Sequence, residues 1–105
     1  MDQTTIITIK KYLNRLPNTI VADQVVVFGS RARGDNRENS DIDVAIVSQN
    51  FNSMSEDEQS RLLYKATTDI YPEIHPWGFT PQEFNTADKQ SSVGSIREQG
   101  LRITF

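Results

Sequence analysis

The sequence predicts a small α/β domain in which helices flank a mixed sheet of three or four strands. Two observations point to this fold class. Apolar residues at helical spacing alternate along the chain with short strand-like runs, an order typical of α/β proteins. The chain has 105 residues, the length of one compact domain without room for two independent cores. We therefore expect residues 1–105 to form a single domain.

The first half of the chain predicts one helix and two strands. Residues 4–16 carry isoleucine and leucine at three- and four-residue spacing, which predicts an amphipathic helix that ends before Pro17. Residues 24–28 form a β-branched apolar run that stops at Gly29, as expected of a central strand buried on both faces. Residues 41–47 alternate in polarity. This alternation places Ile42, Val44 and Ile46 on one face, and Asp41, Asp43, Ala45 and Val47 on the other.

The second half predicts further helices around a shorter strand. A capping box predicts a helix over residues 55–71. Residues 73–79 indicate a third strand, and the proline within it favours a position near the sheet edge. A second capping box at Thr80 starts a short helix, and residues 92–99 predict a last one. Residues 101–105 alternate as a short strand or an anchored tail.

Composition excludes several classes of function. Eleven Lys and Arg against 14 Asp and Glu give a net charge of −3, which argues against stable binding to nucleic acid. The chain has no cysteine, which removes disulfides, thiol catalysis and cysteine-based zinc sites, and the single histidine, His75, excludes a cage of several histidines. No stretch approaches the roughly 20 apolar residues of a membrane helix, and no basic region leads into an apolar run at the start. We expect a cytoplasmic protein without a membrane segment.

The residues that carry chemistry lie between the first and second predicted strands. Gly29 allows close approach to the backbone, and if Ser30 opens a helical turn, its N–H and hydroxyl face a site suited to phosphate oxygens. Asp41 and Asp43 are two apart on a strand, so they share a face and repel each other unless a cation lies between them. Mg²⁺ prefers one or two carboxylates plus phosphate oxygens. The segment therefore predicts a site for a nucleoside triphosphate.

Further candidates follow from what phosphoryl chemistry needs. Two-metal sites commonly use another carboxylate, and Glu73, at the start of the third strand, is our candidate. Arg31 and Arg33 lie nearest the turn and are expected to neutralise phosphate charge; Lys65 is a weaker choice. The alternatives without a functional role are a solvated loop of mixed charge for the arginines and a surface position for Glu73.

The pattern Gly29-Ser30, ten residues, Asp41-Ile42-Asp43 resembles the signature of the nucleotidyltransferase superfamily related to DNA polymerase β. The length resembles the minimal nucleotidyltransferases, which are often encoded beside a HEPN-domain partner. This resemblance implies transfer of a nucleotidyl group, commonly AMP from ATP, with Mg²⁺ (two ions) as cofactor and pyrophosphate leaving. It also implies that Gly29 and Ser30 hold the phosphates, that Asp41 and Asp43 bind metal, and that Glu73 stands where the third acid usually falls.

In the HEPN pairs that the chain resembles, the nucleotidyltransferase is the antitoxin and the acceptor is a tyrosine of the HEPN toxin. We accordingly expect transfer to a hydroxyl of a partner protein, in a possible homo- or hetero-oligomer. Two other functions stay open from the sequence. One is a binding module that neutralises its partner by contact alone, and the other is transfer to a small molecule, with acceptor contacts from a second subunit.

Overall fold

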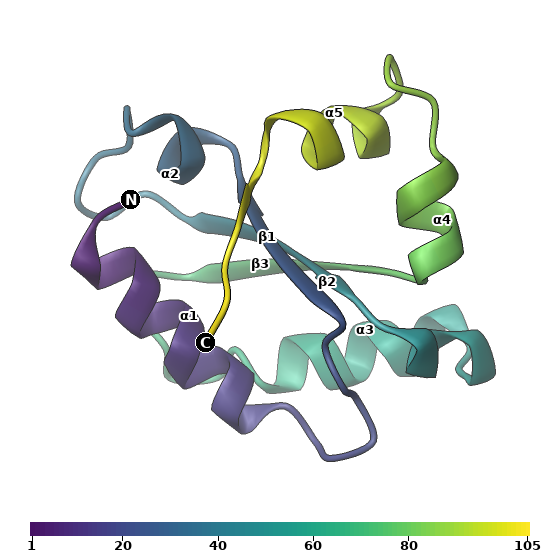
Figure 1. Cartoon of the computed structure of the whole chain (residues 1–105). Helices are drawn as coiled ribbons and strands as arrows, with labels where there is room; N and C mark the ends of the chain where they lie inside the picture. The colour runs from purple at the N-terminus through teal and green to yellow at the C-terminus, as the bar shows by residue number, and fades with distance from the viewer.

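The structure, a computed structural model, describes all residues of the chain from 1 to 105 (Figure 1). In chain order its elements are α1 (Gln3–Arg15), β1 (Gln24–Phe28), α2 (Ser30–Arg33), β2 (Ile42–Val47), the 3-10 helix η1 (Gln49–Ser53), α3 (Glu56–Lys65), β3 (Ile74–Phe79), α4 (Pro81–Thr86), α5 (Ser92–Gln99) and β4 (Leu101–Arg102). None of the helices has the length and apolar character needed to cross a membrane.

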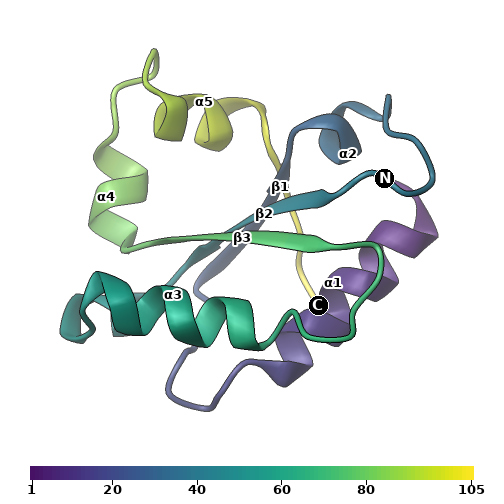
Figure 2. The same ribbon diagram turned by 180° about the vertical axis from the view of Figure 1, so that it is seen from behind.

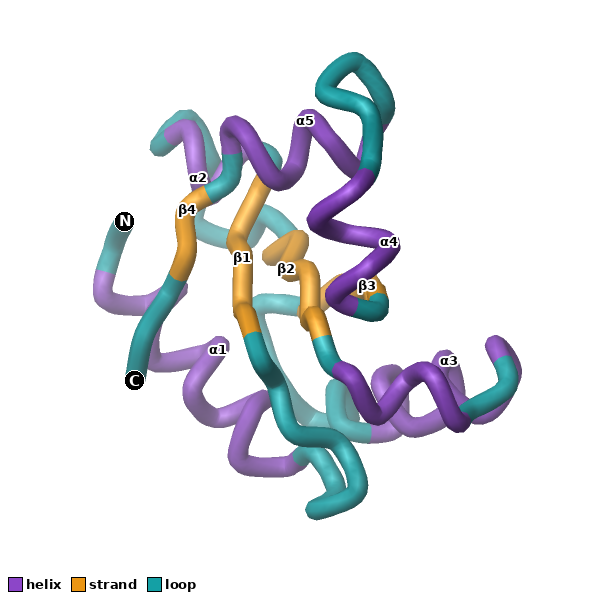
Figure 3. The backbone as a smooth tube through the Cα atoms, turned by 45° about the vertical axis from the view of Figure 1, so that its right-hand side comes forward, coloured by secondary structure: helices purple, strands orange, loops and turns teal.

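The sheet has four strands in the order β3-β2-β1-β4, as the tube in Figure 3 shows. β1 pairs antiparallel with β2 and β4, whereas β2 and β3 run parallel. The mixed α/β fold class is therefore confirmed, with β1 inside the sheet and β3 at its edge as predicted. The loop after Gly29 turns the chain so that β2 returns beside β1, with Phe28 opposite Asp43.

Alternation along the strands divides the protein into two layers of helices, which Figure 2 shows below and above the sheet. Even-numbered residues of β2 pack with α1 and α3 in the main core, where Ile42, Val44 and Ile46 are fully buried. Odd-numbered residues of β2 face α4 and α5, where Ala45 and Val47 pack against Phe84. The faces predicted for β2 are confirmed, and Asp43 lies on the face of α4 and α5.

α3 is shorter than predicted: the helix ends at Lys65 instead of continuing to residue 71. The hydroxyls of Thr67 and Thr68 donate to the carbonyls of Tyr64 and Lys65, at 2.7 and 2.9 Å, and so satisfy helix-end acceptors. The backbone then reverses through Asp69, at φ 60°. The apolar spacing continues beyond the helix because the following turn also packs on the core.

Candidate active site

The turn between β1 and α2 brings the backbone close to a carboxylate. Gly29 has φ 73° and ψ −151°, a conformation that residues with a Cβ avoid. A Cβ at this position would lie 2.8 Å from Oδ2 of Asp43. α2 begins at the next residue, Ser30, so the helical turn on which a phosphate site at Ser30 depends is present. The turn thus places the first residues of a helix beside Asp43, in the arrangement expected of a phosphate cradle.

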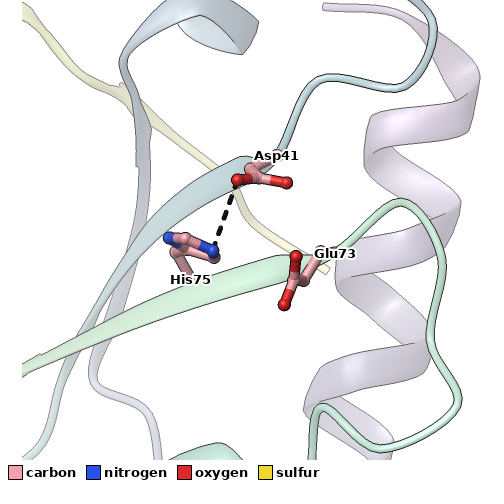
Figure 4. A group of neighbouring side chains, drawn as sticks. All are labelled: Asp41, Glu73 and His75. Atoms are coloured by element: carbon pink, nitrogen blue, oxygen red, sulfur yellow. Dashed lines mark ion pairs between the residues drawn. The ribbon is translucent and has the colours of Figure 1, made fainter.

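Three side chains that can ligate a metal meet where β2 and β3 begin (Figure 4). The amide of Ile42 donates to the carbonyl of Glu73 at 2.8 Å, which sets Glu73 beside Asp41. Nε2 of His75 lies 3.3 Å from Oδ2 of Asp41. One ligand atom from each of Asp41, Glu73 and His75 lies within 4.8 Å of the others. The structure therefore brings Asp41 and the predicted third acid together and adds a histidine.

Asp43 lies deeper than this cluster and is not part of it. It is half-buried, directly opposite His75 in the parallel register and against Gly29. Burial raises the pKa of Asp43, and repulsion from Asp41 adds to this effect. The attraction of His75 and a hydrogen bond from Trp77 oppose the rise in pKa. A cation between the cluster and Asp43 would stabilise the negative charge that burial and Asp41 disfavour. The placement of Asp43 therefore fits a divalent metal.

The donor set can be tested against the expected ion. The carboxylate oxygens of Asp41, Asp43 and Glu73 are ligands that Mg²⁺ prefers. The imidazole of His75 adds a nitrogen, a donor that suits transition metals as well. The residues present therefore fit a divalent cation, and the individual assignments to metal stay predictions.

Arg31 does not lie where the sequence predicts. Its side chain is buried, and its guanidinium donates to the carbonyls of Ser40 and Glu38 and to the hydroxyl oxygen of Thr5. Nη1 also lies 3.6 Å from a carboxylate oxygen of Asp2. These contacts occupy each nitrogen of the guanidinium. Arg31 therefore fastens the loop before β2 to α1, which disagrees with the phosphate contact expected of it.

Arg33 has the opposite environment. Its side chain is exposed, 3.1 Å from Asp35, and it lines a pocket of about 390 Å³ beside Gly29. Trp77 and residues of α5, among them Ser95 and Gln99, form other walls of this pocket. Arg33 thus lies beside Gly29, and its contact with phosphate stays a prediction. Lys65 lies away from this pocket, because α3 packs on the opposite face of the sheet.

Sequence reasoning missed two contributions to the site. His75 shares a strand face with Glu73, which alternation predicts, but its contact with Asp41 depends on the parallel register of β2 and β3. Nothing in the local sequence marks the α5 residues that line the pocket as part of the site, because the sequence there predicts only a helix. Alternation alone predicts that Trp77 lies on the same face of the sheet as His75, because the two residues are two apart on one strand.

We expect Gly29→Ala to lower the free energy of unfolding more than Gly34→Ala, which is the matched control. Both glycines have positive φ, 73° and 81°, but a Cβ at Gly34 would meet nothing within 4 Å. Gly34→Ala should lower the free energy of unfolding by roughly 1 kcal/mol, from the left-handed conformation alone. Gly29→Ala should cost about 1–3 kcal/mol and also displace the carboxylate of Asp43. Urea unfolding measures both losses; equal losses in the two variants would contradict the close approach at Gly29.

Comparison with known proteins shows the family and a similar fold. The sequence model described as "Nucleotidyltransferase domain" matches residues 6–99. A crystal structure of a "putative nucleotidyltransferase" from Sulfolobus solfataricus has a similar fold, with a TM-score of 0.58 and 18% sequence identity, over 97% of this chain and 87% of that one. No curated protein matches the chain.

Proposed function

The chain belongs to the nucleotidyltransferase domain family, and from this premise we propose that it transfers AMP from ATP to a hydroxyl group of a partner protein. The single observation that carries the proposal is the close approach of the Gly29 turn to the carboxylate of Asp43, two residues along the chain from Asp41, which meets Glu73. In the reaction the acceptor oxygen bonds to the α-phosphorus of ATP, the bond from that phosphorus to the bridging oxygen of the β-phosphate breaks so that pyrophosphate leaves, and the hydroxyl proton passes to solvent.

The residues have distinct proposed roles. The backbone at Gly29 and Ser30 holds the phosphates, and the exposed guanidinium of Arg33 adds positive charge beside them. Asp41, Asp43 and Glu73 hold Mg²⁺. When bound, the metal neutralises charge on the triphosphate and favours the deprotonated acceptor oxygen. His75, 3.3 Å from Asp41, orients that carboxylate.

A macromolecular acceptor is favoured by the exposure of the cluster. Asp41 and Glu73 are both exposed, so the site opens directly to solvent rather than into an enclosed acceptor pocket. The family resemblance favours a HEPN-domain protein as this partner, with the chain as its antitoxin.

The test is to incubate the chain with ATP, Mg²⁺ and the protein encoded beside it, and to measure the masses of both proteins by mass spectrometry. We expect one or more AMP adducts on the partner. Asp41→Asn should remove them, whereas Asp57→Asn, the same change at an exposed position of α3, should retain them. Inhibition of the partner that survives Asp41→Asn would indicate a binding module, and adenylated small molecules without a protein adduct would indicate the other acceptor class.

A further inference from the structure

We propose that the groove along the free edge of β3 is a docking site for an extended, positively charged segment of a partner protein. This edge groove has a volume of about 1020 Å³ and lies between α3 and α4. Its lining includes Glu56, Gln59, Tyr64, Trp77, Gly78 and Glu83. Its volume lies at the upper end of the range for small-molecule pockets, which suits a peptide.

The backbone of β3 leaves bonding groups available to such a segment. β3 pairs only with β2, and the carbonyls of Glu73 and Phe79 accept bonds from that side. In a parallel ladder the residues that bond to one neighbour alternate with those that point away. The N–H and C=O of Gly78 and the C=O of Pro76 therefore face the groove. A short extended segment can pair with these groups by strand addition.

The side chains of the groove indicate the chemistry of the segment. Tyr64 and Trp77 are large aromatics left 53% and 50% exposed, as is typical of interaction sites. The charged residues in the lining, Glu56 and Glu83, are both acidic. Lysine or arginine in the segment would complement them.

A second copy of this chain fits the groove poorly. Antiparallel pairing of two β3 edges would bring the same acidic side chains of both copies together. Each edge would also contribute Pro76, which has no N–H to donate at its outward-facing position. Both features oppose self-association and favour a partner with opposite charge.

The edge groove also leads to the candidate active site. Trp77 lines both the groove and the pocket beside Gly29. His75 precedes it by two residues, about 7 Å along the same face of the strand. If the proposed function holds, the segment in the groove is the part of the acceptor protein that delivers the hydroxyl to Asp41 and Glu73.

Trp77 is the chain's one tryptophan, so its fluorescence reports directly on the groove. The experiment titrates the whole chain, without ATP or metal, with an eight-residue peptide of alternating lysine and valine. A peptide with glutamate in place of lysine is the charge control, and a peptide with alternate prolines is the pairing control. We expect saturable binding of the basic peptide only, with slower hydrogen exchange at the Gly78 amide.

The matched variants are Glu56→Lys and Glu58→Lys, which make the same charge change in the first turn of α3, inside and outside the groove lining. Glu56→Lys should weaken peptide binding about three- to tenfold and Glu58→Lys less than about twofold. Equal effects, equal binding of the acidic peptide, or a dimer in sedimentation that Glu56→Lys disrupts would overturn the proposal.

A second measurement separates this inference from the proposed function. Asp41→Asn should abolish AMP transfer. It should leave peptide binding unchanged, because Asp41 lies outside the groove lining. Glu56→Lys should reduce transfer to the partner protein. Peptide binding without any transfer would support the groove and contradict the enzyme, whereas normal transfer by Glu56→Lys would overturn the role of the groove in acceptor docking.

Discussion

Asp43→Asn is expected to reduce nucleotidyl transfer at least about 100-fold while raising the stability of the metal-free protein. The loss of transfer follows from removing a carboxylate that faces the phosphate turn at Gly29. The gain in stability follows because burial and Asp41 raise the pKa of Asp43, so its negative charge is held at a cost in the folded state.

The pH dependence of the stability difference has a defined sign. A carboxyl whose pKa is raised on folding binds its proton more tightly in the folded state. The contribution of Asp43 to the stability of the fold is therefore most favourable below the ordinary aspartate pKa of 3.8. It is lost as the pH rises through the pKa that Asp43 has in the folded protein. In EDTA, the free energy of unfolding in urea should be higher for Asp43→Asn than for the wild type at neutral pH, and this difference should shrink as the pH falls toward 3.8.

Magnesium provides the control for this experiment. Because a ligand that binds only the folded protein stabilises it, Mg²⁺ with ATP should raise the stability of the wild type more than that of Asp43→Asn. A variant that is less stable than the wild type in EDTA would show that the hydrogen bond from Trp77 outweighs the cost of burial.

Arg31→Met is expected to lower the free energy of unfolding by about 2–5 kcal/mol. The side chain is 2% exposed, and its guanidinium lies 2.6 Å from the carbonyl of Ser40, 3.1 Å from that of Glu38 and 3.2 Å from the hydroxyl of Thr5. Methionine fills similar space but leaves these acceptors without their donor. Transfer should fall too, because Ser40 directly precedes Asp41.

Arg33→Met is the matched control, since Arg33 is exposed and pairs only with Asp35. Its stability should remain within about 0.5 kcal/mol of the wild type, while its KM for ATP rises. Denaturant unfolding and steady-state kinetics make this comparison. If Arg31→Met kept normal stability and changed only the KM for ATP, Arg31 would hold phosphate, as the sequence suggested.

The sheet and its two faces were predictable because strand alternation is a local property. Ile42, Val44 and Ile46 alternate with Asp41 and Asp43 on a two-residue period, and a helix cannot accommodate that period on one side. The length of α3 was not predictable from apolar spacing. It is set by the hydroxyls of Thr67 and Thr68, which satisfy the helix end while the core continues beyond it.

The candidate site was predictable only as far as its local motif. Gly29 and Asp43 meet because a turn and a register bring them opposite each other. Arg31 and Arg33 look equivalent in sequence, each within four residues of Gly29. Their different environments depend on α1. Thr5 of this helix, 26 positions away in sequence, accepts a hydrogen bond from the buried guanidinium of Arg31. Such tertiary contacts leave no trace in the spacing of charges.

The division of the sheet into two faces has an evolutionary consequence. On both β1 and β3, some residues pack in the main core with α1 and α3, and others line the pocket beside Gly29 together with α5. Substitutions at Trp77 or in α5 can therefore retune which molecules are accepted without loosening the interior beneath α1 and α3. A scaffold of this kind can diversify its chemistry on one side while selection preserves the other.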